Sequence, residues 1–444
     1  MASRKYSLKQ IMTVTYPILI GLVMEQMLGI TDTIFLGRVG ETELGAAAIA
    51  GIGYLVLYMI GFGFSIGAQI IIGRRNGEGE FSKIGSIFRQ GMFFLIILAT
   101  IMVIFSEWLA PSVMKYAISS PHIMHAVTAY LKWRIPSLFF SFAAAMFRAV
   151  YIGTTKTKVL TYSSIIMLLS NMFLNWTLIF GHFGLPALGI EGAAIGSSMS
   201  EAISLAYLII YTLRKLDLEK YGMERKFKFD KRELKDILSV SVWSMIQNFL
   251  SVFSWMIFFL LAEHLGEEAI AISNIVRNAS GLIWMILTAF AITGSTLASN
   301  LIGEGRSSEV MPLIGRLLKI SYAVIIPIMV VFFIFPGTII RIFTNIPGLI
   351  DISIPSMLVM TASYVVSVPG IILFQAVAGT GNTQKAFILE VAALSIYVAY
   401  CYAIMYIIKA DIAVCWTADS VYALATVIFC GLYLKSGRWK GKKI

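Results

Sequence analysis

Two carboxylates lie inside the first long apolar segment of the chain, residues 11–37. Glu25 is near the middle of this segment, and Asp32 follows seven residues later. Seven residues are about two helical turns, so both side chains would project from one face of a helix. An ionised carboxylate within a bilayer costs at least about 3 kcal/mol unless it finds a partner, water or a proton. We therefore predict that these two acids face a bundle interior and bind an ion or a substrate.

A second polar pair lies on the fifth apolar segment, where Asn171 and Asn175 are spaced i, i+4 and share a helix face. Amide side chains are costly in lipid unless they form hydrogen bonds. They could join neighbouring helices, or they could complete a cation or proton site with Asp32, which is the interpretation we favour. Two alternatives stay open for the acids: Asp32 could reach water at the membrane surface, and Glu25 could pair with Arg148.

Pro17 lies two turns before Glu25 and should bend the first helix, because proline cannot donate to the helical ladder. Elsewhere, Glu201 could be functional or could pair with a cation, and Glu390 could reach the cytoplasm. The acids of the first half lie nearer the membrane centre than those of the second half, so we expect ion coupling in the first half. The possible additional polar cleft residues are Ser197, Ser198, Glu201, Gln247, Asn248 and Glu390.

The composition is that of a polytopic membrane protein. Of 444 residues, 58% are hydrophobic and only 13% are charged, against about 25% charged in a soluble protein. Three cysteines late in the chain argue against a disulfide framework or a thiolate metal site. His122 and His125 are a weak metal pair, and no phosphate-binding loop or catalytic triad pattern is present. We therefore expect no enzyme activity, no metal and no cofactor other than a coupling ion.

Twelve apolar segments are long enough to cross a bilayer. We expect an all-α membrane protein with spans near residues 11–37, 45–73, 86–110, 131–152, 158–183, 188–213, 236–262, 268–302, 321–340, 354–378, 386–408 and 411–434.

The lysines and arginines orient these spans. With the N-terminus in the cytoplasm, 27 of the 35 basic residues fall on the cytoplasmic side and six fall outside, as the positive-inside rule requires. Both termini are then cytoplasmic, and the first span, which no small-residue cleavage site follows, is expected to be a retained signal anchor. The basic stretch 214–235 is expected to be a cytoplasmic linker retained beside anionic lipid, and not a nucleic-acid site.

Short matches indicate that the two halves repeat. Residues 39–46 (VGETELGA) correspond to 265–272 (LGEEAIAI), and 76–80 (NGEGE) to 302–306 (IGEGR), both at an offset of 226. A third match, IGTT at 152 with TGNT at 380, has an offset of 228. Six spans per copy preserve orientation, so the expected symmetry axis runs along the membrane normal. We predict an N-lobe of residues 1–213, the linker 214–235 and a C-lobe of residues 236–444 with a basic tail, around a central cleft.

The ordered set of motifs resembles one transporter family. Pro17 followed by DTIFLGRVG and LGAAAIAG, SIGAQIIIGRRNGEGE, the paired turns GTTKTK and GTGNTQK, and NMFLNWTLIFG with LGIEGAAIGSSMSE are similar to the multidrug and toxic compound extrusion (MATE) transporters, especially their DinF-like branch. The resemblance covers essentially the whole chain. It implies twelve helices in two six-helix lobes related by pseudo-two-fold symmetry, with a V-shaped cleft.

The resemblance also implies an activity and roles for particular residues. It implies export of amphipathic, often cationic, compounds driven by inward flow of H⁺ or Na⁺, with H⁺ favoured here. Asp32 matches the coupling aspartate, Asn171 and Asn175 match the polar pair that faces it, and Pro17 matches the proline whose bend accompanies protonation. Acids that some members carry on spans seven and ten are missing. We expect a monomer in the bacterial inner membrane.

Three other classes of membrane protein fit the sequence less well. A lipid-linked saccharide flippase of the same superfamily would need a more basic cleft, and we expect Arg148 and Arg277 to be the only buried cations, with Arg134 on the outer side. A major facilitator would carry GxxxDRxGR after its second span, where this chain has IGRRNGEGE. An intramembrane enzyme would need a nucleophile and base, or a metal, on facing helices. The exporter interpretation is therefore favoured.

Overall fold

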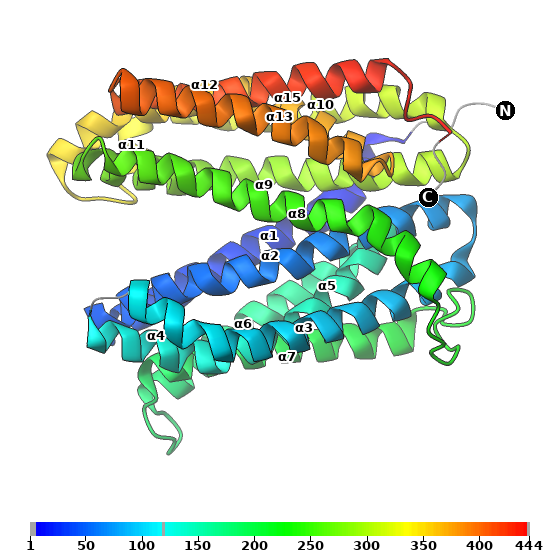
Figure 1. Ribbon diagram of the computed structural model, residues 1–444, viewed down its shortest axis with the longest axis horizontal. Helices are drawn as coiled ribbons and strands as arrows, with labels where there is room; N and C mark the ends of the chain where they lie inside the picture. Colours follow the sequence, from blue (N-terminus) through cyan, green and yellow to red (C-terminus); the bar gives the residue numbers. More distant parts are fainter. Residues whose placement is uncertain (1–5, 118–119, 442–444) are drawn as a thin grey trace. The chain divides into compact units, whose positions relative to one another are not determined.

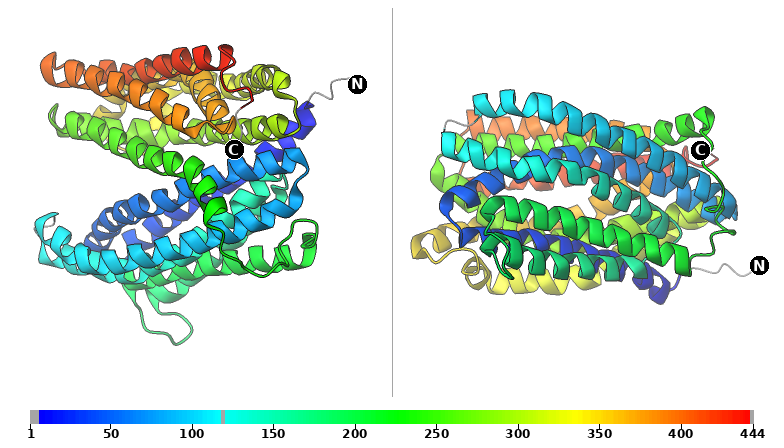
Figure 2. Two further views of the ribbon diagram at one scale, coloured as in Figure 1. Left: turned by 45° about the vertical axis from the view of Figure 1, so that its right-hand side comes forward. Right: turned by 90° about the horizontal axis from the view of Figure 1, so that it is seen from below.

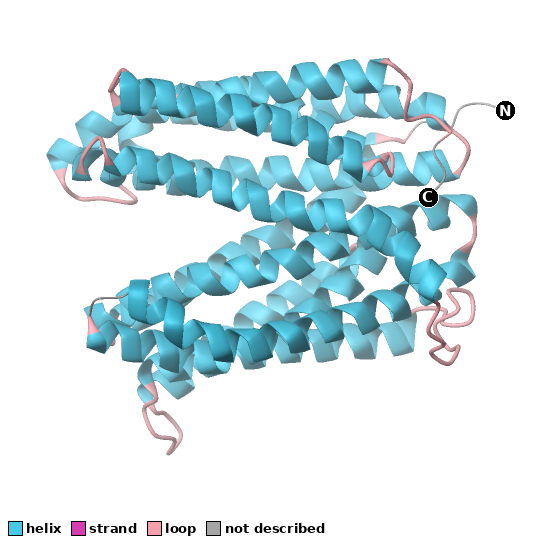
Figure 3. Cartoon of the chain, viewed as in Figure 1, coloured by secondary structure: helices cyan, strands magenta, loops and turns pink. Residues whose placement is uncertain are grey.

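The computed structural model describes residues 6–117 and 120–441. Within them the secondary structure is helical throughout, with no strand (Figure 3). Twelve helical stretches are long and apolar enough to cross a membrane, and each overlaps one of the twelve segments expected from the sequence. The all-α fold class is therefore confirmed. Of the basic residues used for orientation, Arg4, Lys5, Lys442 and Lys443 lie outside the described residues.

The first six spans run from α1 to α7 (Figure 1). The fourth span is made of α4, a 3₁₀ turn and α5, because Pro136 cannot continue the α-helical ladder. Ser120 caps α4, since its hydroxyl accepts a hydrogen bond from the Ile123 amide. The helices of this half are α1 (Leu8–Gly37), α2 (Glu41–Glu78), α3 (Phe81–Ala117), α4 (Pro121–Arg134), α5 (Leu138–Gly153), α6 (Lys158–Phe180) and α7 (Gly189–Lys215).

The last six spans run from α8 to α15. A π-helical turn, Tyr402–Ile407, ends the eleventh span, and the Asp411 side chain caps the short helix that follows it. The helices of this half are α8 (Lys231–Glu263), α9 (Glu267–Gly303), α10 (Val310–Ile334), α11 (Pro336–Ile340), α12 (Pro347–Gly379), α13 (Thr383–Cys401), α14 (Ile412–Cys415) and α15 (Thr417–Lys435).

The chain forms two compact units that exchange the starts of their first helices. One unit is Tyr16–Ile246, and the other combines Met1–Thr15 with Gln247–Ile444. Helix α1 therefore begins in the second unit and continues in the first, while α8 does the reverse. We name these the first unit and the second unit. The lobe boundaries expected from the sequence stay a prediction about the repeat, because a unit defined by packing need not end where a repeat ends.

The two exchanged segments dock in corresponding ways. In the first unit, α8 approaches α2 so closely that a Cβ atom on Gly67 would overlap the Ser241 backbone, which is the role of small residues in membrane helix packing. In the second unit, the Thr15 and Thr293 hydroxyls lie 3.0 Å apart in a hydrogen bond. Thr15 and Ser241 are 226 residues apart, as are Gly67 and Thr293, so the exchange follows the repeat.

The segment between α7 and α8 folds back onto the first unit (Figure 2). The Arg89 guanidinium on α3 donates to the Gly222 carbonyl, and the Gln90 amide donates to the Lys228 carbonyl at 2.8 Å. Glu233, in the first turn of α8, accepts a hydrogen bond from the Ser86 hydroxyl. Hydrogen bonds at several positions therefore hold the basic linker against α3.

Helices α1 and α8 are the least buried of the twelve spans, and neither packs along its length against a single partner. The close packing of the first unit lies elsewhere, above all between α6 and α7. Specific side-chain contacts therefore matter more for holding α1 than for holding the other helices of its unit.

Candidate functional site

The pairing of α6 with α7 places the polar residues of the first unit. Gly192 and Gly196 on α7 face α6, where a Cβ atom on Gly192 would lie 2.6 Å from the Leu178 carbonyl oxygen, and one on Gly196 would overlap Asn175. Only a glycine surface allows this approach. As a result, Asn171 and Asn175 are 0% exposed and must find their hydrogen-bond partners within the protein.

Asp32 closes a four-residue polar cluster with this helix pair. Asn175 Nδ2 donates to Asp32 Oδ1 at 2.5 Å, and Ser197 Oγ lies 3.0 Å from Asp32 Oδ2. Asn175 also donates to Asn171 Oδ1 at 3.2 Å, and Asn171 Nδ2 donates to Ser197 Oγ at 3.0 Å. We call Asp32, Asn171, Asn175 and Ser197 the aspartate cluster. Each Asp32 oxygen has a protein partner, but the residue is also partly exposed, so the alternative in which Asp32 reaches water stays open.

The hydrogen atoms in the aspartate cluster suit an ionised Asp32. Both amide hydrogens of Asn175 are used, one on Asp32 and one on Asn171. Ser197 accepts from Asn171, which leaves its own hydrogen for Asp32. A carboxylate only accepts, whereas a protonated acid must also donate. The hydrogen bonds to the carboxylate among the described residues come from the neutral donors Asn175 and Ser197, and Arg134 adds positive charge at the site.

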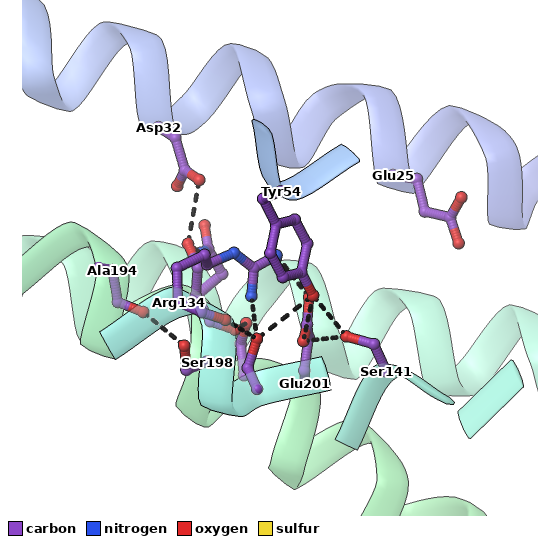
Figure 4. Close-up of polar contacts among 12 residues, drawn as sticks. Glu25, Asp32, Tyr54, Arg134, Ser141, Ala194, Ser198 and Glu201 are labelled. Atoms are coloured by element: carbon purple, nitrogen blue, oxygen red, sulfur yellow. Dashed lines mark hydrogen bonds and ion pairs between the residues drawn. The ribbon is translucent and has the colours of Figure 1, made fainter. Parts of the chain in front are cut away.

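Glu25 does not join the aspartate cluster. Glu25 and Asp32 project from the same side of α1 (Figure 4), as the spacing of seven residues predicts. Glu25 nevertheless forms an ion pair with Arg148 of α5, whose side chain is 22% exposed. The alternative in which Glu25 pairs with Arg148 is therefore confirmed as its contact in this structure.

Glu201 also lies in an ion pair, and its partner was missed in the sequence. Arg134 Nη2 lies 2.5 Å from Glu201 Oε1, and the two side chains are only 11% and 16% exposed. The Arg134 guanidinium stacks 4.0 Å from the centre of the Tyr54 ring, a cation–π contact. The expectation of Arg148 and Arg277 as the only buried cations is therefore wrong, because Arg134, expected on the outer side, is largely buried beside Glu201.

Hydroxyl groups complete the surroundings of this pair (Figure 4). The Ser141 hydroxyl donates to Glu201 Oε2, and the Tyr54 hydroxyl is 2.7 Å from Ser141 Oγ. Ser137 accepts from Arg134 Nη1 at 2.8 Å. Both Glu201 oxygens and both terminal nitrogens of Arg134 thus have partners, as a buried pair requires for stability. In the sequence, the only signal for this ion pair was Glu201, an acid in span six with no evident cationic partner.

Two other candidates have structural contacts. Ser198 Oγ donates within α7 to the Ala194 carbonyl and lies 3.0 Å from the Trp133 carbonyl, so it faces α4 and not Asp32. Pro17 is inside the continuous helix α1, two residues after the point where α1 passes from the second unit to the first. The proline therefore removes a backbone hydrogen bond at the unit boundary.

The remaining candidates belong to the second unit. Gln247 and Asn248 are half-buried on α8 at the start of that unit's share of the helix. Glu390 on α13 is 4% exposed and is reached by the Ser251 and Tyr422 hydroxyls. The alternative in which Glu390 extends to the cytoplasm is therefore wrong. Among the described residues, no three His, Cys, Asp or Glu side chains gather as a metal site.

The sequence and the fold match one family of known proteins. The sequence profile of the MatE family matches residues 17–177 and 244–403. The two matches start 227 residues apart, close to the repeat offset of 226, so each half contains one copy of the family's repeat. The matched residues make up most of the chain. The chain belongs to the MatE family.

Individual relatives are similar over most of their length. A probable multidrug resistance protein NorM from Thermotoga maritima is 24% identical over 386 residues, which cover 86% of this chain and 82% of the relative. A probable NorM from Photorhabdus laumondii subsp. laumondii is 25% identical over 361 residues, covering 78% and 76%. Placement in the DinF-like branch stays a prediction.

Solved structures share the fold. A MATE crystal structure in the bent conformation has a TM-score of 0.87 at 16% identity, covering 96% of this chain and 94% of that one. A MOP superfamily transporter from Pyrococcus furiosus, described as having a binding pocket of reverse polarity, has a TM-score of 0.89 at 16% identity, covering 96% and 95%. At this identity the likeness concerns the fold.

Proposed function

We propose that the chain is a multidrug exporter that uses an inward H⁺ gradient, with Asp32 as the proton-binding residue. The observation that carries the proposal is the bonding of Asp32 on α1 to Asn175 and Ser197 on the closely packed α6–α7 pair. Family membership and the multidrug resistance names of the NorM relatives support export of small amphipathic molecules.

The proton acts through the attachment of α1. Asp32 accepts one charge-assisted hydrogen bond from each of two neutral donors, a stronger kind of bond than that between neutral groups. A proton on Asp32 removes this charge and turns one carboxyl oxygen into a donor. The link from α1 to α6 and α7 then weakens. Because α1 packs loosely otherwise, its end beyond Pro17 moves, and the substrate is released outside.

The other buried charges serve a different purpose in this scheme. Arg148 is paired with Glu25, and Arg134 is paired with Glu201. A flippase for lipid-linked saccharides would need free cations for a phosphate group, and these two arginines are already bound to carboxylates. Arg277, in the second unit, donates to the Asn274 side chain and lies over the Trp255 and Phe259 rings. The paired charges instead give the first unit a fixed polar interior beside the titrating Asp32.

The proposal includes an orientation. The asymmetry of 27 basic residues against six places both termini and the linker in the cytoplasm. The membrane is the bacterial inner membrane, and the transporter works as a monomer. Asp32 then lies in the outer half of the first span, where a proton from outside reaches it first.

Efflux from proteoliposomes tests the proposal. Wild type should export a fluorescent cationic dye when a pH gradient is imposed, and Asp32→Asn should lose this export, because an amide cannot titrate. Asp351→Asn is the matched control, since Asp351 is exposed at the start of α12. Full export by Asp32→Asn would exclude the assignment. If a Na⁺ gradient at constant pH drove export instead, the coupling ion would be Na⁺ and not H⁺.

A further inference from the structure

We infer that Glu390 is a proton-binding residue of the second unit and that it holds a proton in the packing described here. The inference concerns a site separate from Asp32, and it stands whether or not Asp32 carries the coupling ion. It rests on the position of Glu390 in its helix, on its partners and on the number of hydrogen atoms that those partners supply.

Glu390 lies in the middle of the buried face of α13. The buried residues of this helix follow helical spacing, and Glu390 is the only acid among them: Thr383, Ala386, Glu390, Ala393, Leu394, Tyr397 and Cys401. The Glu390 side chain is 4% exposed, and its Oε2 atom has no hydrogen-bond partner among the described residues. An ionised carboxylate in such a place would leave a charged oxygen unsolvated, which is strongly unfavourable.

The hydrogen count at Ser251 indicates where the proton is. Ser251 Oγ lies 2.7 Å from Glu390 Oε1 and 3.0 Å from the Gln247 carbonyl oxygen. A serine hydroxyl has one hydrogen, and a carbonyl oxygen can only accept. If the Ser251 hydrogen goes to Gln247, the 2.7 Å contact needs a hydrogen from Glu390. A protonated Glu390 supplies it by donating from Oε1 to Ser251 Oγ, so both short contacts become hydrogen bonds.

The groups that face Glu390 are uncharged. Tyr422 on α15 donates at 3.5 Å, and Cys430 on the same helix lies close by. Helix α8 contributes the Ser251 hydroxyl, and no charged or titratable group on α12 contacts the carboxyl within the described part of the chain. With no cation beside it and few oxygen ligands around it, the site is suited to a proton and not to a metal cation.

The site ties α8 to α13 in a proton-dependent way. Ser251 lies just inside the second unit's share of α8, which begins at Gln247. While Glu390 holds its proton, it donates to α8. Once the proton leaves, Ser251 can give its single hydrogen to Glu390 only by releasing the Gln247 carbonyl. The second unit therefore has its own titrating contact, made with the helix that continues into the first unit.

Infrared spectroscopy of the full-length protein in detergent tests the inference, because protonated carboxyl groups have their own C=O stretching band. At neutral pH, wild type should show such a band, Glu390→Gln should lose it, and Asp32→Asn should keep it. Ser251→Ala should shift the band to higher frequency, because the acid loses its acceptor. An unchanged band in Glu390→Gln would overturn the inference.

Two further measurements address misfolding of the Glu390→Gln variant and competition of Na⁺ for the site. Glu390→Gln keeps the size of the side chain, and size-exclusion chromatography checks that it folds; if it does not, the presence or absence of the Ser251→Ala shift decides the outcome. Addition of Na⁺ at constant pH and ionic strength should leave the wild-type band in place. Loss of the band on adding Na⁺ would show that a cation displaces the proton and would overturn assignment as a proton site.

The melting temperature provides an independent readout. A folded state that holds a proton on Glu390 binds one more proton near neutral pH than the unfolded state, in which an ordinary glutamate is ionised. Stability should therefore fall as the pH rises, and Glu390→Gln should make this dependence flatter. An equally steep fall in the variant would contradict the inference.

Discussion

The two units place a membrane-embedded acid and its hydrogen-bond partners on different helices. In the first unit the acid Asp32 is on α1, the first span of its half, and the donors are on α6 and α7. In the second unit the acid Glu390 is on α13, the fifth span of its half, and the hydroxyl of Ser251 is on α8, the first span. The first span of the half therefore carries the carboxyl in the first unit, whereas in the second unit it carries the hydroxyl that contacts the carboxyl.

The difference can be followed along the repeat. At the offset of 226, Asp32 corresponds to Phe258, which is 3% exposed and packs 4.9 Å from the Trp416 ring, and Glu25 corresponds to Ser251. The amide donors that suit an ionised Asp32 are replaced around Glu390 by hydroxyls that suit an acid. A repeat in sequence thus preserves the helices without preserving the charge state of the residues between them.

Placing an acid at the Asp32 position of the second unit should have the largest effect. Phe258→Asp removes a buried aromatic ring, which alone costs about 3–5 kcal/mol, and it adds a carboxylate where no amide donor faces it. We expect a large fall in melting temperature and little folded protein in size-exclusion chromatography. Phe258→Leu, which keeps an apolar side chain, is the control and should remain folded. A stable Phe258→Asp variant would mean that the second unit can hold an ionised acid after all.

A smaller effect should come from breaking one ion pair of the first unit. Arg134→Met leaves Glu201 buried without its cation, and loss of one partner of a buried pair costs about 3–5 kcal/mol. The double variant Arg134→Met with Glu201→Met should recover much of the loss. Arg148→Met should lower the melting temperature less, because Glu25 is 35% exposed and reaches water more easily. Equal effects at the two arginines would contradict the difference in burial.

The smallest effect should come from the donor to Asp32. Asn175→Ala removes one hydrogen bond to a charged group, worth about 1.5–3 kcal/mol. The ionised form of Asp32 is stabilised less in this variant, so the pH at which dye efflux is half-maximal should move upward. Met172→Ala, an exposed position on the same helix, is the control. An unchanged pH profile in Asn175→Ala would show that the aspartate cluster does not set the pH dependence of efflux.

The sequence predicted the helices well because hydropathy and length determine them locally. All twelve spans overlap their expected ranges, and the i, i+4 spacing of Asn171 and Asn175 correctly placed both on the face toward Asp32. These features depend on one helix, or on two helices that are neighbours in sequence.

The sequence did not reveal contacts whose partners are far apart in the chain. We expected Arg134 on the outer side because the apolar segment that contains it begins near residue 131. In the structure this span begins earlier, at Pro121 with helix α4, so Arg134 lies within the span. Its partners Tyr54 and Glu201 come from α2 and α7. No local pattern distinguishes an arginine at a membrane surface from one that a distant glutamate holds inside.

The reciprocal exchange of helix starts has a consequence for how the protein is made. The α1 residues before Tyr16 complete their unit only after Thr293 has been synthesised, because their hydrogen-bonded partner is on α9. Likewise, the unit that begins at Tyr16 is incomplete until Ile246 has emerged. A polypeptide cut between α7 and α8 would therefore yield two fragments that each lack part of their own packing, and only co-expression of both should rebuild a stable molecule.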